Sequence, residues 1–226
     1  KIPYAENPAA HASAWVRILT ALSVLGRELL LMVYPHRLSP DYSFDAIPLV
    51  TSVLDWRLLA SLLVLGTLST AAFLCRRHHP VVTYGAVWYF VSIFPASNLL
   101  VPVGTILGER LLYLPSVGFC LAAALGLDRI GSRRFAPYAA GAAAVVLFAL
   151  GAKTLSYSAA WSDEVSLFRA AVASQPRSGK AHQLLGEALM EEGRTEEAVT
   201  ELQTAAVILA PSPEFPVGQW IELGVA

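Results

Sequence analysis

Long apolar segments fill the first two thirds of this sequence and restrict the folds open to it. Residues 56–75 carry one charged side chain, Arg57, near their start. A helix that crosses a lipid bilayer needs about 20 predominantly apolar residues, and this segment meets that requirement. Three further segments of the same character follow, at residues 81–94, 111–127 and 137–155. The sequence therefore predicts an all-α fold whose first part is a multi-pass membrane domain.

A fifth apolar segment, residues 14–34, contains the charged residues Arg17, Arg27 and Glu28. Because Arg27 and Glu28 are adjacent, their side chains point to different parts of a helix surface. We expect a helix that either lines a polar cavity or is only partly immersed in the bilayer. The sequence leaves open whether this helix spans the membrane.

Composition supports this prediction and excludes several other classes of protein. The chain is 55% hydrophobic and 15% charged, with a mean hydropathy of +0.54, whereas soluble domains carry about 25% charged residues. A net charge of -1 offers no basic surface for nucleic acid. Two cysteines, Cys75 and Cys120, make neither a disulfide scaffold nor a cysteine-based zinc site. Most acidic residues follow Trp161, so we expect a membrane domain over residues 1–160 and a small soluble domain over residues 161–226.

The charges of the short loops predict an orientation in the membrane. The loops at residues 76–80 and 128–134 are basic, and basic loops favour the cytoplasmic side. The loops at residues 35–55 and 95–110 should then lie on the opposite side, together with everything after Trp161. That side is the periplasm for a bacterial inner membrane and the lumen for the endoplasmic reticulum, and the sequence leaves both hosts open.

The soluble tail contains an internal repeat with a period of about 34 residues, which is typical of tetratricopeptide (TPR) repeats. The recurring positions are Phe168, Ala171 and Pro176, followed by Leu202, Ala205 and Ala210. Residues 178–211 form one full repeat, in which Gly193 fits the tight turn between two antiparallel helices. Residues 161–177 supply half a repeat before it, and the acidic residues between 191 and 201 are expected to form a solvated helix face.

A third repeat begins near the end of the chain. Trp220, Leu223 and Gly224 reproduce the W-x2-L-G opening of the TPR consensus. Because about three repeats are needed to bury a continuous core, we expect the natural protein to continue with more of them.

Four polar residues stand between the apolar segments at the predicted membrane boundary: Asn98, Glu109, Arg110 and Tyr113. Polar groups at this depth are costly unless they are paired or used. The planar guanidinium of Arg110 suits a phosphate, because it can bind two oxygens at once. From the residues alone, the more common interpretation is that Glu109 and Arg110 are interfacial anchors or pair with other helices.

The same stretch resembles the transmembrane and tetratricopeptide repeat (TMTC) family. The chain reads P-A-S-N at residues 95–98 and E-R-L-L-Y-L-P-S-V-G-F-C at residues 109–120. E-N-P at residues 6–8, L-S-P-D-Y-S-F at residues 38–44 and W-S-D-E at residues 161–164 resemble further elements of that family, in the same order. The resemblance therefore covers essentially the whole chain.

The resemblance implies a polytopic glycosyltransferase of the GT-C type. Such enzymes transfer a sugar, usually mannose, from a polyprenyl phosphate to a protein hydroxyl on the lumenal or periplasmic face. By this resemblance Arg110 would contact the donor phosphate and Glu109 would orient it, while Asn98 and Tyr113 would shape the pocket. The acceptor protein would bind the TPR repeats.

The catalytic carboxylates that the resemblance implies lie upstream of this chain, so the chain alone is expected to be inactive. Asp41 and Asp45 are weaker candidates, because solvated loop carboxylates are common, and Asn7 is a further candidate as part of the E-N-P element. The adjacent His78 and His79 do not indicate a metal site, since neighbours in a loop rarely converge on one ion. No residue set predicts a metal site, although a divalent metal is left open as a cofactor.

Two other functions compete with a protein O-glycosyltransferase. The first is a membrane-anchored TPR module that binds partner proteins without catalysis. The second is a related transferase that acts on a glycan or lipid acceptor. A plain anchor does not need the four boundary polar residues, and TPR surfaces usually bind polypeptide, so both features favour the protein transferase.

Overall fold

All regular secondary structure in the described part of the chain is helical, which confirms the predicted all-α class. The computed structural model describes residues 2–35, 38–130 and 136–212. Eight α-helices and four short 3-10 helices follow one another within these ranges. The predicted third repeat, with Trp220, Leu223 and Gly224, lies outside the described residues.

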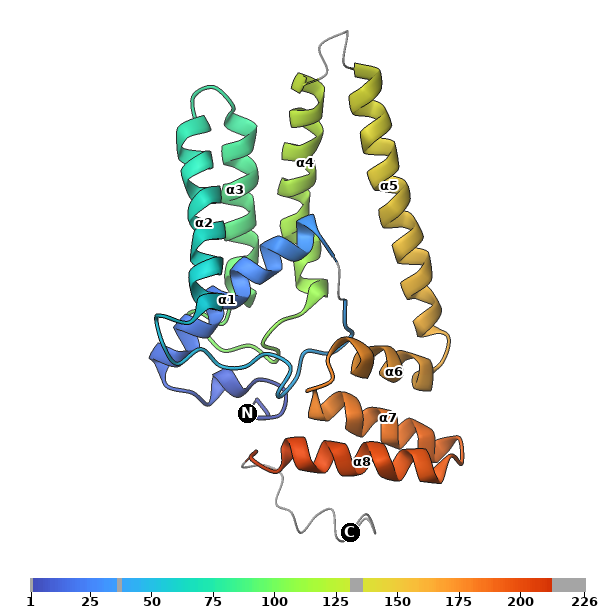
Figure 1. The fold of residues 1–226 in the computed structure, drawn as a ribbon. Helices are drawn as coiled ribbons and strands as arrows, with labels where there is room; N and C mark the ends of the chain where they lie inside the picture. The colour runs from blue at the N-terminus through green and yellow to red at the C-terminus, as the bar shows by residue number, and fades with distance from the viewer. Residues whose placement is uncertain (1, 36–37, 131–135, 213–226) are drawn as a thin grey trace.

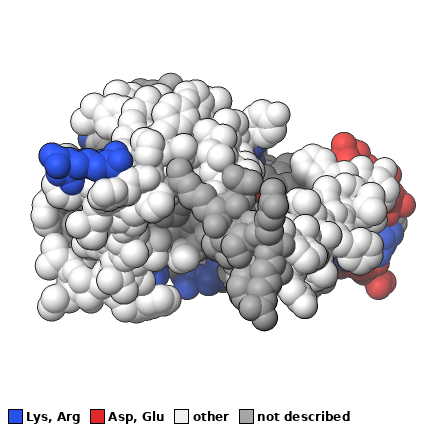
Figure 2. Space-filling model, turned by 90° about the horizontal axis from the view of Figure 1, so that it is seen from above, with Lys and Arg blue, Asp and Glu red and all other residues white. Residues whose placement is uncertain are grey.

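The four helices predicted from apolar segments are present and run roughly lengthwise (Figure 1). They are α2 (Trp56–Cys75), α3 (Pro80–Ile93), α4 (Tyr113–Ile130) and α5 (Ala136–Ser158). Two helical segments are long and apolar enough to cross a membrane, Trp56–Cys75 and Ala136–Trp161, and Pro80–Ala96 is a shorter apolar helix. Seen from the end opposite the tail, Figure 2 shows Lys and Arg side chains at several places and most Asp and Glu side chains at one margin. No residue of α5 is buried, and its exposed surface is apolar over most of its length. This apolar exposure suits a lipid environment.

Two of these predictions differ from the structure in detail. The segment predicted at residues 111–127 begins later as a regular helix, because Glu109–Leu112 forms a 3-10 turn, η3, before α4. The segment at residues 14–34, for which the sequence left a membrane span open, forms α1 (Ala14–Val33). This helix runs obliquely to α2 (Figure 1). Nearly half of its residues are buried, including Glu28. The helix α1 is thus packed inside the protein rather than exposed all round.

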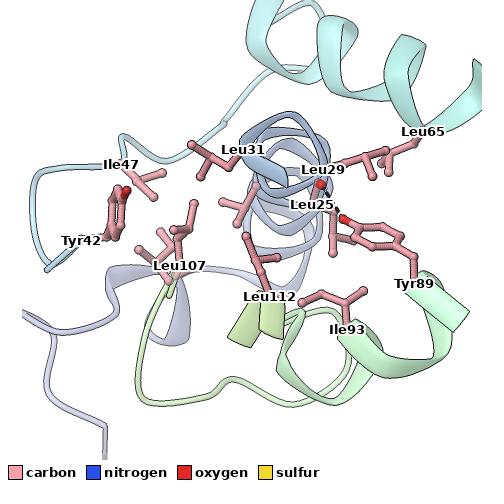
Figure 3. Close-up of a cluster of buried hydrophobic side chains, with 13 residues drawn as sticks. Leu25, Leu29, Leu31, Tyr42, Ile47, Leu65, Tyr89, Ile93, Leu107 and Leu112 are labelled. Atoms are coloured by element: carbon pink, nitrogen blue, oxygen red, sulfur yellow. Dashed lines mark hydrogen bonds between the residues drawn. The ribbon is translucent and has the colours of Figure 1, made fainter. Parts of the chain in front are cut away.

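The largest cluster of buried apolar side chains forms where α1 meets α2, α3 and the loops at one end of the helices (Figure 3). Its larger buried members are Leu25, Leu29, Leu31, Tyr42, Ile47, Leu65, Tyr89, Ile93, Leu107 and Leu112. The Tyr89 hydroxyl donates a hydrogen bond to the carbonyl oxygen of Leu25 at 2.8 Å. This bond satisfies the buried hydroxyl and ties α3 to α1.

Small residues allow two close helix crossings among the apolar helices. A Cβ atom at Gly26 of α1 would lie 2.6 Å from the Oγ atom of Ser61 in α2, and one at Gly118 of α4 would lie 2.7 Å from the carbonyl oxygen of Gly85 in α3. Side chains at these positions would force the helices apart. The apolar helices therefore have fixed neighbours, which positions the loops at their ends.

The tail consists of α6 (Glu164–Ser174), α7 (Gly179–Glu191) and α8 (Thr195–Leu209). The helices α7 and α8 cover the predicted repeat at residues 178–211 and are joined by a turn in which Gly193 has a φ of +76°. Ala198 and Ala205 of α8 are fully buried, and a Cβ atom at Gly186 would lie 2.6 Å from Cγ of Leu202. The small residues thus let the two helices pack closely, as the repeat pattern predicts.

The tail is docked on the loop that follows α1. The amide of Gly179 donates to the carbonyl oxygen of Phe44 at 2.7 Å, and the amide of Asp45 donates to that of Arg177 at 2.8 Å. The ring of Phe44 packs against Ala205 and Leu209 of the tail. The tail therefore lies at the end of the helices where the loops at residues 38–55 and 94–112 also meet (Figure 1).

Candidate functional site

A pocket of about 470 Å3 opens where the two parts of the chain meet. One wall is the loop at residues 39–43, and a second is the segment at residues 104–110 that leads into α4. The third wall comes from the end of α5 and from the tail, through Tyr157, Trp161 and Phe168. Neither part of the chain forms this pocket alone.

Glu109 is held firmly within the pocket. Its Oε1 atom accepts a hydrogen bond from the Tyr42 hydroxyl at 2.5 Å and one from the backbone amide of Ser39 at 2.8 Å. Burial raises the pKa of the Glu109 carboxyl, while these two hydrogen bonds and the charge of Arg27 oppose the rise. Burial and the nearby Glu109 also raise the pKa of Tyr42, so Tyr42 stays a hydrogen-bond donor. The carboxyl of Glu109 is therefore fixed in position before any ligand arrives.

Arg110 lies beside Glu109 on η3 and lines the same pocket. Its side chain is exposed, and it forms no hydrogen bond or ion pair with any residue that the structure describes. All five of its N–H donors are therefore open to a ligand. A guanidinium in this state suits a phosphate, which it can bind through two parallel hydrogen bonds.

Asn98 lies behind the pocket and is bonded to Asn7. The Nδ2 atom of Asn7 donates to Oδ1 of Asn98 at 2.9 Å, and the same oxygen accepts from the amide of Val103 at 2.9 Å. The Nδ2 atom of Asn98 donates to the carbonyl oxygen of Thr105 at 3.0 Å. Asn7 and Asn98 are buried, and Thr105 lines the pocket. The two asparagines thus hold the loop that forms one wall and do not themselves face the pocket.

Asp41 lines the pocket, but its carboxylate is already bonded. It accepts hydrogen bonds from the Ser43 hydroxyl at 2.6 Å and the Ser178 hydroxyl at 2.9 Å. Ser178 in turn caps α7 by accepting from the amide of Ala181 at 3.2 Å. Asp41 therefore links the loop to the first turn of the tail pair.

The structure does not bring Asp45 or Tyr113 to the pocket. Asp45 forms an ion pair with Arg177 at the docked tail. The side chain of Tyr113, at the start of α4, is 83% exposed and is not among the pocket residues. Of the predicted residues, Glu109, Arg110 and Asp41 thus share one pocket, while Asn7 and Asn98 share a separate buried cluster.

Sequence reasoning missed two groups of the pocket. Tyr42 is contained in the L-S-P-D-Y-S-F segment, but only the fold shows that its hydroxyl meets Glu109. Lys180 and Glu6, which form an ion pair at 3.0 Å on the pocket rim, lie 174 residues apart in the sequence. No local pattern signals a pair at that separation.

The pocket offers no preformed metal centre in the described residues. No group of three or more His, Cys, Asp and Glu side chains lies close enough to hold an ion there. The carboxylates of Asp41 and Glu109 both accept hydrogen bonds from protein donors. The polar chemistry that the described chain itself offers is thus a free guanidinium beside a fixed carboxyl.

Comparison with known proteins gives a consistent family. Residues 3–69 match the family model described as "Protein O-mannosyl-transferase TMTC, DUF1736". The chain is 32% identical to protein O-mannosyl-transferase Tmtc3 of Drosophila melanogaster over 211 residues, which are 90% of this chain and 23% of that protein. It is 32% identical to protein O-mannosyl-transferase TMTC1 of Mus musculus over 209 residues, 88% of this chain and 22% of that protein.

A third relative, protein O-mannosyl-transferase Tmtc2 of Drosophila melanogaster, is 41% identical over 132 residues, 58% of this chain and 14% of that protein. No solved structure matches the chain. The chain spans about a quarter of the length of the curated relatives named first. On the family model and the shared sequence, the chain belongs to the TMTC family.

Proposed function

We propose that the full-length protein transfers a sugar, mannose by its family, from a polyprenyl-phosphate donor to a serine or threonine hydroxyl of an acceptor protein. The relatives' names support a protein O-mannosyl-transferase. The observation that carries the proposal is the unpaired guanidinium of Arg110, which stands in a pocket beside the fixed carboxyl of Glu109. That pocket lies at the end of the apolar helices, within reach of a lipid-linked phosphate.

The same arrangement supports a proposal for the side of the membrane on which the pocket lies. The turn between α2 and α3 carries the basic residues 76–79, and the facing ends of α4 and α5 lie at the same end of the structure (Figure 1). The tail lies at the other end, together with the loops at residues 39–43 and 104–110 that line the pocket (Figure 1). Since basic loops favour the cytoplasm, this supports a multi-pass protein whose pocket and tail face the lumen or periplasm.

In the proposed reaction the bond between the sugar C1 atom and the donor phosphate oxygen breaks, and a bond between C1 and the acceptor oxygen forms. Negative charge grows on the departing phosphate, and Arg110 stabilises it through charge-assisted hydrogen bonds. Glu109, which Tyr42 and Ser39 hold in place, orients the donor. The base that takes the proton of the acceptor hydroxyl would be one of the upstream carboxylates that the family resemblance implies.

The tail fits the role of an acceptor-binding module. Its helices α7 and α8 have the small-residue packing of a TPR repeat, and we divide the chain into a membrane domain, residues 1–160, and TPR repeats, residues 161–226. Leu167, Phe168 and Leu184 of the tail line the pocket. An acceptor polypeptide bound there would have its hydroxyl close to Arg110.

The test compares Arg110→Ala with Arg169→Ala in the full-length protein. Arg169 is a matched control because it lies on α6, is exposed, and forms only a loose ion pair with Glu197 at 3.6 Å. Transfer of labelled mannose from polyprenyl-phosphate mannose to protein should fall about 100-fold in Arg110→Ala, since one donor to a developing oxyanion contributes on that order. Arg169→Ala should keep the parent's rate.

Unchanged transfer by Arg110→Ala at equal protein level would overturn the assignment of the site. Absence of transfer by the parent, together with no binding of polyprenyl-phosphate mannose, would favour the alternative of a membrane-anchored interaction module without catalysis.

A further inference from the structure

A second pocket, of about 350 Å3, lies between α1, the first turn of α2 and the end of α6. Ser23 of α1 and Ser61 of α2 form its floor, and the Ser61 hydroxyl donates to the carbonyl oxygen of Ser23 at 2.7 Å. The floor is therefore satisfied internally. What remains open to a ligand is the rim.

The rim carries positive charge and no carboxylate. Arg27 and Arg57 line the pocket, and no Asp or Glu does. Arg27 forms no hydrogen bond or ion pair in the described residues, and its guanidinium lies 5.6 Å from the ring centre of Tyr42. Arg57 is partly used, because it pairs with Asp55 through Nε at 3.0 Å and Nη2 at 2.5 Å, and its Nη1 donates to the carbonyl oxygen of Pro48 at 3.5 Å. Gln175 also lines the pocket, and its side-chain amide bonds to no described residue. Positively charged and neutral donors thus converge on a rim whose lining residues include no carboxylate.

The position of this pocket points to the bilayer as the source of its ligand. Trp56, the first residue of α2, is 75% exposed, and Leu30 of α1 is 51% exposed. Both line the pocket, and the exposed apolar face of α2 continues from it through Leu59 and Leu63. Tryptophan at the end of an apolar helix is typical of the membrane–water boundary. A molecule held here has its polar part at the arginines and its apolar part along the helix.

We propose that this pocket binds the phosphate headgroup of an anionic glycerophospholipid, with its acyl chains along the exposed face of α1 and α2. Arg27 supplies the main charge, and the remaining donors of Arg57 and the amide of Gln175 bind further phosphate oxygens. The first pocket, which contains Arg110, differs from this second pocket because three carboxylates line it, those of Glu6, Asp41 and Glu109. The proposal does not depend on the function of that first pocket.

The test is native mass spectrometry of the purified full-length protein in detergent, with added phosphatidylglycerol or phosphatidylcholine. The parent should retain one phosphatidylglycerol molecule and should bind it about tenfold more tightly than phosphatidylcholine. Arg27→Gln and Arg57→Gln should each weaken that binding about tenfold, the effect of losing one charge-assisted contact. Arg76→Gln is the matched control, because it removes one exposed arginine from the other end of the same helix.

Equal loss in Arg76→Gln would mean a general attraction of charge and would overturn the proposal. Equal binding of phosphatidylcholine, or saturation by inorganic phosphate alone, would also overturn it. Tenfold tighter binding of polyprenyl phosphate than of phosphatidylglycerol would overturn the assignment to the bulk lipid. If Arg27→Gln lowers the melting temperature, the comparison of Arg57→Gln with Arg57→Lys tests the proposal instead. The lysine variant keeps the charge and should keep part of the phosphatidylglycerol binding, whereas the glutamine variant should lose it.

Discussion

Two polar clusters, Asn98 with its distant partner Asn7 and Glu109 with Arg110, contribute to the same pocket in opposite ways. The asparagines are buried and bonded to each other and to the loop at residues 103–105. Arg110 is exposed and bonds to no described residue. Buried polar groups are hydrogen-bonded as a rule, so the asparagines maintain shape. The open guanidinium is the group that remains available for a ligand.

The largest effect is expected at Asn98. Asn98→Ala removes three hydrogen bonds from a buried site and leaves the Asn7 amide and the Val103 amide short of an acceptor. The free energy of unfolding should fall by about 2–4 kcal/mol, the sum expected for several unsatisfied buried groups. Thermal unfolding of the purified protein in detergent measures this, and a fall below about 0.5 kcal/mol would mean that the cluster does not hold the loop.

Asn98→Gly separates two parts of this loss. Asn98 has a φ of +59°, a conformation that glycine adopts without strain and alanine does not. The glycine variant should therefore be less destabilised than the alanine variant by about 1 kcal/mol. Equal loss in both variants would assign the whole effect to the hydrogen bonds.

Substitution of Glu109 should change the pH dependence of turnover, because the proposed role of Glu109 depends on its charge and not on its packing. Burial raises the pKa of its carboxyl, so Glu109 takes up a proton at a higher pH than an exposed glutamate. If the carboxylate orients the donor, turnover should fall as the pH drops through this raised pKa. Glu109→Gln should reduce turnover at least about tenfold at neutral pH and remove this acidic limb.

The pH dependence of stability gives an independent readout with the opposite sign. The folded protein holds the Glu109 proton more tightly than the unfolded chain, so the free energy of unfolding should decrease as the pH rises between the ordinary and the raised pKa. Glu109→Gln should abolish this decrease. A turnover limb that survives in Glu109→Gln would belong to another group.

The parts of this structure that sequence reasoning could predict are those set by local composition. Twenty apolar residues predict α2 from length alone, and the spacing of Ala198 and Ala205 predicts the packed face of α8. The structure starts α4 two residues later than the predicted segment at residues 111–127. Glu109 and Arg110 begin a 3-10 turn there, which an apolar pattern does not reveal.

The candidate site was predictable only where its residues are adjacent in sequence. Glu109 and Arg110 stand out as charges at an apolar boundary. The bond from Asn7 to Asn98 joins residues 91 apart, and the bond from Tyr42 to Glu109 joins residues 67 apart. Contacts of that separation depend on how α1 crosses the other helices, so a single sequence cannot distinguish an asparagine behind the wall from one that faces the pocket.

Asp41 is intermediate between the two clusters, since it lines the pocket but is fully engaged. Asp41→Asn keeps the shape of the side chain but weakens its bonds to Ser43 and to Ser178, the cap of α7. We expect a loss of about 1–2 kcal/mol in the free energy of unfolding, with a smaller reduction in turnover than in Arg110→Ala. Ser178→Ala should give a similar loss, because it removes the same bond and the cap. A turnover loss as large as that of Arg110→Ala, without a change in stability, would show that Asp41 acts on the substrate.

The smallest effect is expected at the ion pair between Asp45 and Arg177, although it joins the two parts of the chain. The Arg177 side chain is 68% exposed, and exposed ion pairs contribute less than about 1 kcal/mol because water and salt screen them. A double-mutant cycle with Asp45→Asn and Arg177→Gln should therefore give a coupling energy below that value, falling further at high salt. The docking of the tail should survive, because the backbone bonds from Gly179 to Phe44 and from Asp45 to Arg177 do not involve these side chains. Loss of transfer activity in Arg177→Gln at an unchanged melting temperature would show instead that this pair sets the position of the tail over the pocket.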